Sequence, residues 1–119
     1  MADNKKFAKD LEKRTCKFAV SIINLSSKLP NTPEGRIIRT QLTKAGTSIG
    51  ANYREANRAR SKADFTNKIK ICESEASETQ YWMEIIAETA LMDFKHLKIY
   101  YDECSELLAI FASVGKRLY

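Results

Sequence analysis

Apolar residues in this chain recur at alternating steps of four and three residues over many consecutive turns. In residues 61–92 this rhythm is kept by one stripe: Phe65, Ile69, Cys72, Ala76, Thr79, Met83, Ile86 and Ala90. The average step of 3.5 residues is the repeat of helices that pack side by side through left-handed knobs-into-holes contacts. A strand needs apolar residues at every second position, and no long segment has that period. The pattern therefore predicts an all-α fold.

Start and stop signals divide the chain into four predicted helices. Asn31 or Thr32 can cap a helix that has Pro33 in its first position, and Ser61 with Asp64 resembles a capping box. Consecutive helices must run in opposite directions because their connectors are short, at residues 29–32, 58–62 and 92–95. The sequence therefore predicts one domain over residues 1–119, an antiparallel up-down-up-down four-helix bundle with left-handed packing.

Composition agrees with a globular helical protein. The chain has 119 residues, of which 44% are hydrophobic and 29% charged, with only two prolines and four glycines. No segment approaches the roughly 18 to 20 uncharged residues that cross a bilayer. We therefore expect a cytoplasmic protein with no membrane partner.

The side chains that enzymes use for metal binding and nucleophilic catalysis are few and scattered. Cys16, Cys72 and Cys104 lie far apart on apolar helix faces, which predicts reduced thiols in the core. His96 is the single histidine, so the paired Glu-x-x-His motifs of a di-metal bundle are missing. We expect no enzyme activity, no metal and no cofactor.

Several polar residues occupy positions where a bundle usually has aliphatic ones. Asn52 falls on the inner stripe of the second helix, where an unpaired amide would cost about 1–3 kcal/mol. It is either a structural hydrogen-bonding residue that fixes helix register or a ligand contact. Glu75 and Glu78 flank the third stripe beside Trp82, where they suit bonds from another helix or subunit. We group Glu55 with them as a candidate oligomer contact.

Gly46 and Gly50 lie one turn apart inside the second predicted helix. Each costs roughly 1 kcal/mol relative to alanine in a helix, so a packing reason is expected. With Thr43 and Thr47 they form a smooth patch that predicts a helix–helix contact, within the chain or between subunits. The alternative is a tolerated weak point or bend.

Charge is distributed unevenly along the chain. Residues 54–70 contain six bases and two acids, whereas residues 71–94 contain six acids and no base. This order opposes the dipole of the third helix, so local helix stability does not explain it. Either the basic and acidic stretches of different protomers pair, or the basic stretch contacts phosphate. The net charge of +5 favours phosphate. The candidate nucleic-acid-binding residues are Arg54, Arg58, Arg60, Lys62, Lys68 and Lys70.

Two strings at a compatible separation also carry a family resemblance. Residues 48–56 read SIGANYREA and residues 73–82 read ESEASETQYW, with Arg60-Ser61 and Asp64-Phe65 between them. This arrangement resembles the four-helix-bundle proteins encoded by intervening sequences of bacterial 23S ribosomal RNA genes, and the resemblance spans roughly residues 7–114. Ala56 departs from the glycine that is common in that family.

The resemblance implies an antiparallel four-helix bundle that assembles into a ring, a homopentamer, with a basic surface for RNA or DNA. It also implies kinship with the accessory protein of diversity-generating retroelements, which engages a reverse transcriptase. No catalytic residue is carried over. We therefore expect a non-enzymatic oligomer that binds nucleic acid, RNA in preference to DNA. The alternative is a homo-oligomeric scaffold or protein-interaction module that binds no nucleic acid.

Overall fold

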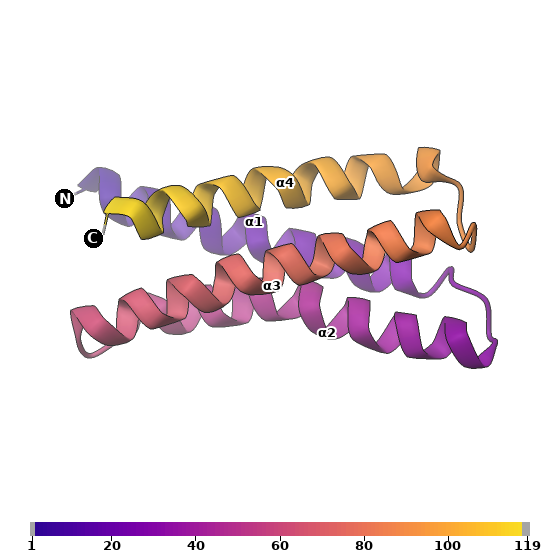
Figure 1. Cartoon of the computed structure of the whole chain (residues 1–119). Helices are drawn as coiled ribbons and strands as arrows, with labels where there is room; N and C mark the ends of the chain where they lie inside the picture. The colour runs from indigo at the N-terminus through magenta and orange to yellow at the C-terminus, as the bar shows by residue number, and fades with distance from the viewer. Residues whose placement is uncertain (1, 118–119) are drawn as a thin grey trace.

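The computed structural model of the chain describes residues 2–117, and four helices account for most of them (Figure 1). Helix α1 spans Ala2–Ser26, α2 Pro33–Ala56, α3 Lys62–Glu88 and α4 Phe94–Arg117. Consecutive helices run in opposite directions along a body of 47 × 21 × 21 Å, and no strand occurs among the described residues. The predicted antiparallel four-helix bundle is confirmed.

The helix boundaries follow the local signals, with one exception. Thr32 Oγ1 accepts a hydrogen bond from the Gly35 amide at 3.1 Å, and Ser61 Oγ accepts one from the Asp64 amide at 3.0 Å, so both predicted caps are formed. The third helix ends at Glu88, several residues earlier than predicted. Ala90 has a φ of 55°, a left-handed conformation that ends a helix, and it is exposed rather than on the inner stripe.

The core runs the length of the bundle and takes side chains from all four helices. Ile22, Leu42, Met83 and Phe111 are fully buried. On α2 the buried aromatic is Tyr53, whose ring meets that of Phe111 edge-on at 5.5 Å. Within residues 2–117 no helix is both long enough and apolar enough to cross a bilayer.

The cysteines divide into two classes. Cys72 and Cys104 are buried, and their thiols donate to the carbonyl oxygens of Ile49 and Ala76 at 3.4 and 3.2 Å. Burial raises the pKa of each thiol to about 12. The prediction of a core position was wrong for Cys16, which is exposed because it faces away from the interior, beside the groove between α1 and α2.

Helix α1 contacts its two neighbours very differently. Gly46 and Gly50 of α2 face α1 of the same chain, where an added Cβ would lie 2.7 Å from Ile22 Cγ2 and 2.9 Å from Thr15 Oγ1. The α1–α4 seam, by contrast, has the sparsest packing of any neighbouring pair of helices. The two glycines thus serve close packing between helices within one chain.

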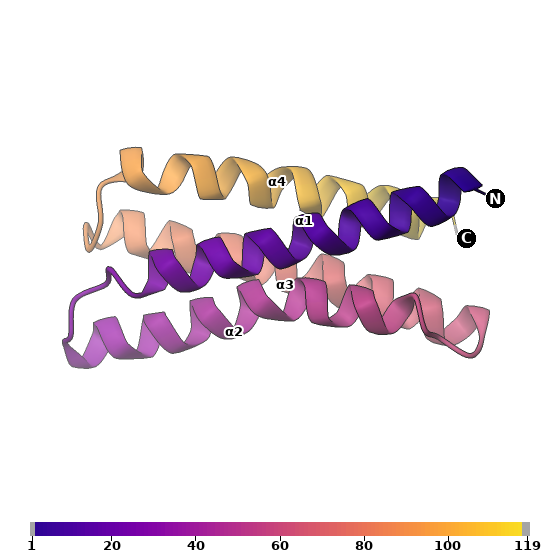
Figure 2. The same cartoon turned by 180° about the vertical axis from the view of Figure 1, so that it is seen from behind.

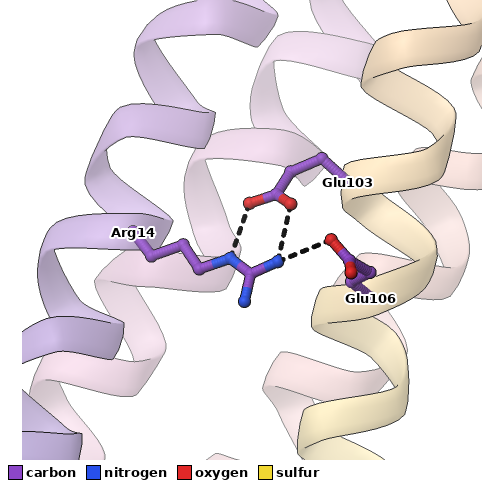
Figure 3. A network of polar contacts seen from close by, with 3 residues as sticks. All are labelled: Arg14, Glu103 and Glu106. Atoms are coloured by element: carbon purple, nitrogen blue, oxygen red, sulfur yellow. Dashed lines mark hydrogen bonds and ion pairs between the residues drawn. The ribbon is translucent and has the colours of Figure 1, made fainter.

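A three-residue ionic network spans the α1–α4 seam (Figure 3). The Arg14 guanidinium donates to both carboxylate oxygens of Glu103, from Nε at 2.8 Å and from Nη2 at 2.7 Å. Arg14 Nη2 also donates to Glu106 Oε2 at 2.8 Å. The paired guanidinium lowers the pKa of Glu103 below its usual value. Charge pairing therefore joins α1 to α4 where close packing is lacking.

Candidate nucleic-acid interface

One end of the bundle gathers three segments that are far apart in the sequence. The start of α1, the connector between α2 and α3, and the end of α4 all lie at this end in both views (Figures 1 and 2). We define the basic end as residues 2–13, 47–70 and 108–117. These ranges hold 12 of the 20 lysines and arginines but only five of the 15 aspartates and glutamates. The basic end therefore carries a formal charge of +7, whereas the rest of the chain carries −2.

Three of the predicted binding residues are well placed to meet a polyanion. Arg58, Arg60 and Lys62 are exposed, and within residues 2–117 none of them has an ion-pair partner. They lie at the connector and in the first turn of α3, where the positive end of the helix dipole also attracts anions. Phosphate groups can approach these side chains without breaking any existing pair.

The other three predicted residues have partners or lie apart. Arg54, which is 61% exposed on its side chain, pairs with Glu12 at 3.7 Å. Lys68 pairs with Glu55 at 3.0 Å, and this hydrogen bond raises the pKa of Lys68. Lys70 is exposed further along α3, beside Glu73. Glu55 thus contacts a base of its own chain.

A surface groove between α1 and α2 opens toward the basic end. It has a volume of about 430 Å³, and Arg54 and Arg58 contribute to its lining. The other lining residues include the carboxylates Glu12 and Glu55 and the small or uncharged residues Cys16, Gly50 and Ala51. The groove is therefore a shallow hollow of mixed charge beside the exposed connector bases.

Five lysines of the basic end were not among the predicted binding residues. Lys5, Lys6, Lys9 and Lys13 of α1 and Lys116 of α4 are exposed. The up-down-up-down order was the signal that could have found them, because it brings both chain ends to the α2–α3 connector. The cationic surface is therefore wider than the connector alone.

Among the predicted polar contact residues, Asn52 lies within the basic end, whereas Glu75, Glu78 and Trp82 lie outside it. Asn52 is half-buried rather than on the inner stripe, and its Nδ2 donates to the Ser48 carbonyl of its own helix at 2.8 Å. Glu75 is half-buried, and burial, together with the nearby charge of Glu78, raises its pKa. Glu78 Oε2 accepts a hydrogen bond from Trp82 Nε1 at 3.3 Å.

No metal-binding geometry accompanies these carboxylates. Across the described part of the chain, no three side chains of the types His, Cys, Asp and Glu are grouped so that they could hold a metal ion.

Comparisons with known proteins agree with this architecture. The sequence model of the family described as "23S rRNA-intervening sequence protein" matches residues 9–113. A crystal structure of a protein with unknown function from the S23 ribosomal protein family of Bacteroides thetaiotaomicron superposes with a TM-score of 0.85 at 35% identity. The alignment covers 92% of this chain and 97% of that one. No curated protein matches the chain. The chain belongs to the 23S rRNA-intervening sequence protein family.

Proposed function

We propose that this protein is a non-enzymatic homo-oligomer that binds nucleic acid, structured RNA in preference to DNA, through the basic end. The observation that carries the proposal is the concentration of charge at that end, +7 against −2 elsewhere. Arg58, Arg60 and Lys62 are its exposed, unpaired centre within the described residues. The family description, which refers to 23S rRNA, supports RNA as the polyanion.

Phosphate contacts determine how such binding should behave. Each neutralised phosphate releases counterions, so the affinity should fall steeply as salt rises. Contacts to the sugar–phosphate backbone carry little sequence information, so the affinity should vary weakly with RNA sequence. Several copies in one assembly would multiply weak contacts by avidity. The protein would therefore recognise folded RNA by charge and shape.

The test is a charge reversal at the centre of the basic end. Arg58→Glu/Arg60→Glu should abolish retention of a labelled RNA hairpin in a gel-shift titration at low salt, while the circular dichroism spectrum stays that of the wild type. Arg36→Glu/Lys44→Glu is the matched control, since it makes the same change in net charge at exposed residues outside the basic end that form no ion pair within residues 2–117. Unchanged RNA retention by the first variant would overturn the proposal.

A scaffold without nucleic-acid binding is the second candidate. The Arg54–Glu12 and Lys68–Glu55 pairs favour it, because they show that part of the basic end is already neutralised by carboxylates. This alternative predicts no titratable RNA binding near physiological salt and dissociation of the assembly when Arg58 and Arg60 are reversed. Light scattering performed beside the gel-shift series separates the two functions.

A further inference from the structure

The long sides of the bundle carry a second division of charge that RNA binding at the basic end leaves unexplained. Residues 14–46, in α1 and α2, contain six bases and one acid. Residues 71–107, in α3 and α4, contain two bases and nine acids. Away from the basic end, one half of the molecule is therefore cationic and the other half is anionic.

An apolar groove follows the loosely packed seam between α1 and α4. Two cavities of about 390 and 500 Å³ share Ile99 and Tyr100, so together they form one depression, the α1–α4 groove. Its floor includes Phe18 and Leu25 of α1. Ile99 is 73% exposed, which leaves a large aliphatic side chain in water. Covering this groove would bury apolar surface that the monomer leaves exposed.

The rim of the α1–α4 groove is cationic. Lys17, Lys28 and Lys95 line it and are exposed, and no ion pair involves them in the region from residue 2 to residue 117. Arg14 also lines the groove, but Glu103 and Glu106 already balance its charge (Figure 3). An occupant that fits this groove therefore has an apolar centre with carboxylates on either side.

The outer face of α3 has that composition. Tyr81 is 53% exposed, and Glu78, Glu84 and Glu88 lie three or seven residues from it on the same side of the helix. We call these four residues the acidic face. Helices α1 and α3 are not in contact, since they occupy diagonal corners of the bundle. The acidic face cannot reach the α1–α4 groove of its own chain.

We propose that the acidic face of one copy docks into the α1–α4 groove of a second copy. Tyr81 would cover Ile99 and Tyr100, while the flanking carboxylates would meet Lys17, Lys28 and Lys95. The two surfaces differ, so the contact is heterologous and every copy offers one of each. This inference rests on the self-association in the proposed function and names its surfaces; the basic end takes no part in it.

The experiment uses two variants that each reverse one surface at exposed residues. Lys17→Glu/Lys28→Glu alters the groove, and Glu78→Lys/Glu88→Lys alters the acidic face. By light scattering, the wild type should exceed the monomer mass of 13.6 kDa, and each variant alone should return to it. An equimolar mixture of the two variants should assemble again. The intact acidic face of the groove variant can dock into the intact groove of the other variant, and the two reversed surfaces are also opposite in charge.

Three results would overturn the inference: a monomeric wild type, a variant that keeps the wild-type mass, or a mixture that stays monomeric. Arg58→Glu/Arg60→Glu is the control and should assemble like the wild type. The monomeric groove variant should still retain the RNA hairpin, with lower affinity because avidity is lost. Assembly without RNA retention would refute the proposed function and leave this interface standing. RNA retention by a wild type that never assembles would refute this interface and the self-association in the proposed function, and would leave its nucleic-acid binding standing.

Discussion

The two seams of α1 join the same helix to its neighbours by opposite means. On the α2 side, Gly46 and Gly50 remove side chains so that the helices pack closely, with no space for another atom. On the α4 side, Arg14 reaches across to Glu103 and leaves an apolar groove beside it. Close packing is rigid and excludes partners, whereas a charged bridge over a groove leaves a surface that another molecule can use. The comparison separates the structural side of α1 from the side that is available for binding.

The largest effect is expected when the closely packed seam is forced apart. Gly46→Leu should lower the free energy of unfolding by about 3 kcal/mol, because its side chain would displace Ile22 in a filled interior. Chemical denaturation measures this loss. Gly115→Ala is the matched control: nothing lies within 4 Å of its added Cβ, so it should gain about 0.5–1 kcal/mol from helix propensity. A Gly46→Leu protein as stable as the wild type would refute the close-packing interpretation.

A smaller loss is expected at the charged seam. Arg14→Ala removes a bidentate pair whose side chains are 37% and 31% exposed, so solvent screening limits the cost to about 1 kcal/mol. Since the pKa of Glu103 is lowered in the folded protein, the network stabilises above the ordinary glutamate pKa and loses its contribution as pH falls through the lowered pKa. Denaturation of both proteins from pH 7 to pH 2 should show the difference shrinking with acid. A difference that does not depend on pH would contradict this account.

The smallest effect is expected at Glu75, whose carboxylate forms no ion pair within residues 2–117. Burial and Glu78 raise the pKa of Glu75, and the charge of Lys44 opposes this only in part. Because a raised folded pKa makes the ionised carboxylate unfavourable, Glu75→Gln should stabilise the protein by a few tenths of a kcal/mol at pH 7. The gain should vanish once acid protonates Glu75 in the wild type. Glu88→Gln, at an exposed position, provides the comparison, and a loss of stability in Glu75→Gln would contradict the prediction.

The periodic pattern predicted the fold well because burial, capping and connector length all act locally. It was less reliable where neighbouring positions compete for one face. The four-three spacing places Asn52 on the inner stripe, but the structure buries Tyr53 instead. The Tyr53 ring packs against Phe111 in the core, whereas the amide of Asn52 would find no apolar contact of that kind. Similarly, no rule of spacing indicated that Ala90 would adopt a left-handed conformation.

The candidate site was predictable only in part. The connector bases Arg58, Arg60 and Lys62 stand out in the sequence as a dense cationic stretch. That Glu12 would partner Arg54 depends on how α1 lies beside α2, and such contacts between distant residues follow from the assembled bundle. The α1–α4 groove has the same origin, since it forms from two helices at opposite ends of the chain.

The antiparallel order has a practical consequence for anyone who purifies this protein. Helix α1 begins and helix α4 ends at the basic end, so an affinity tag fused to either terminus is attached at the same end of the bundle as the α2–α3 connector (Figures 1 and 2). A polyhistidine tag adds cationic charge there at mildly acidic pH, and an acidic epitope tag offers carboxylates that compete with phosphate. Measurements of RNA affinity therefore require tag-free material.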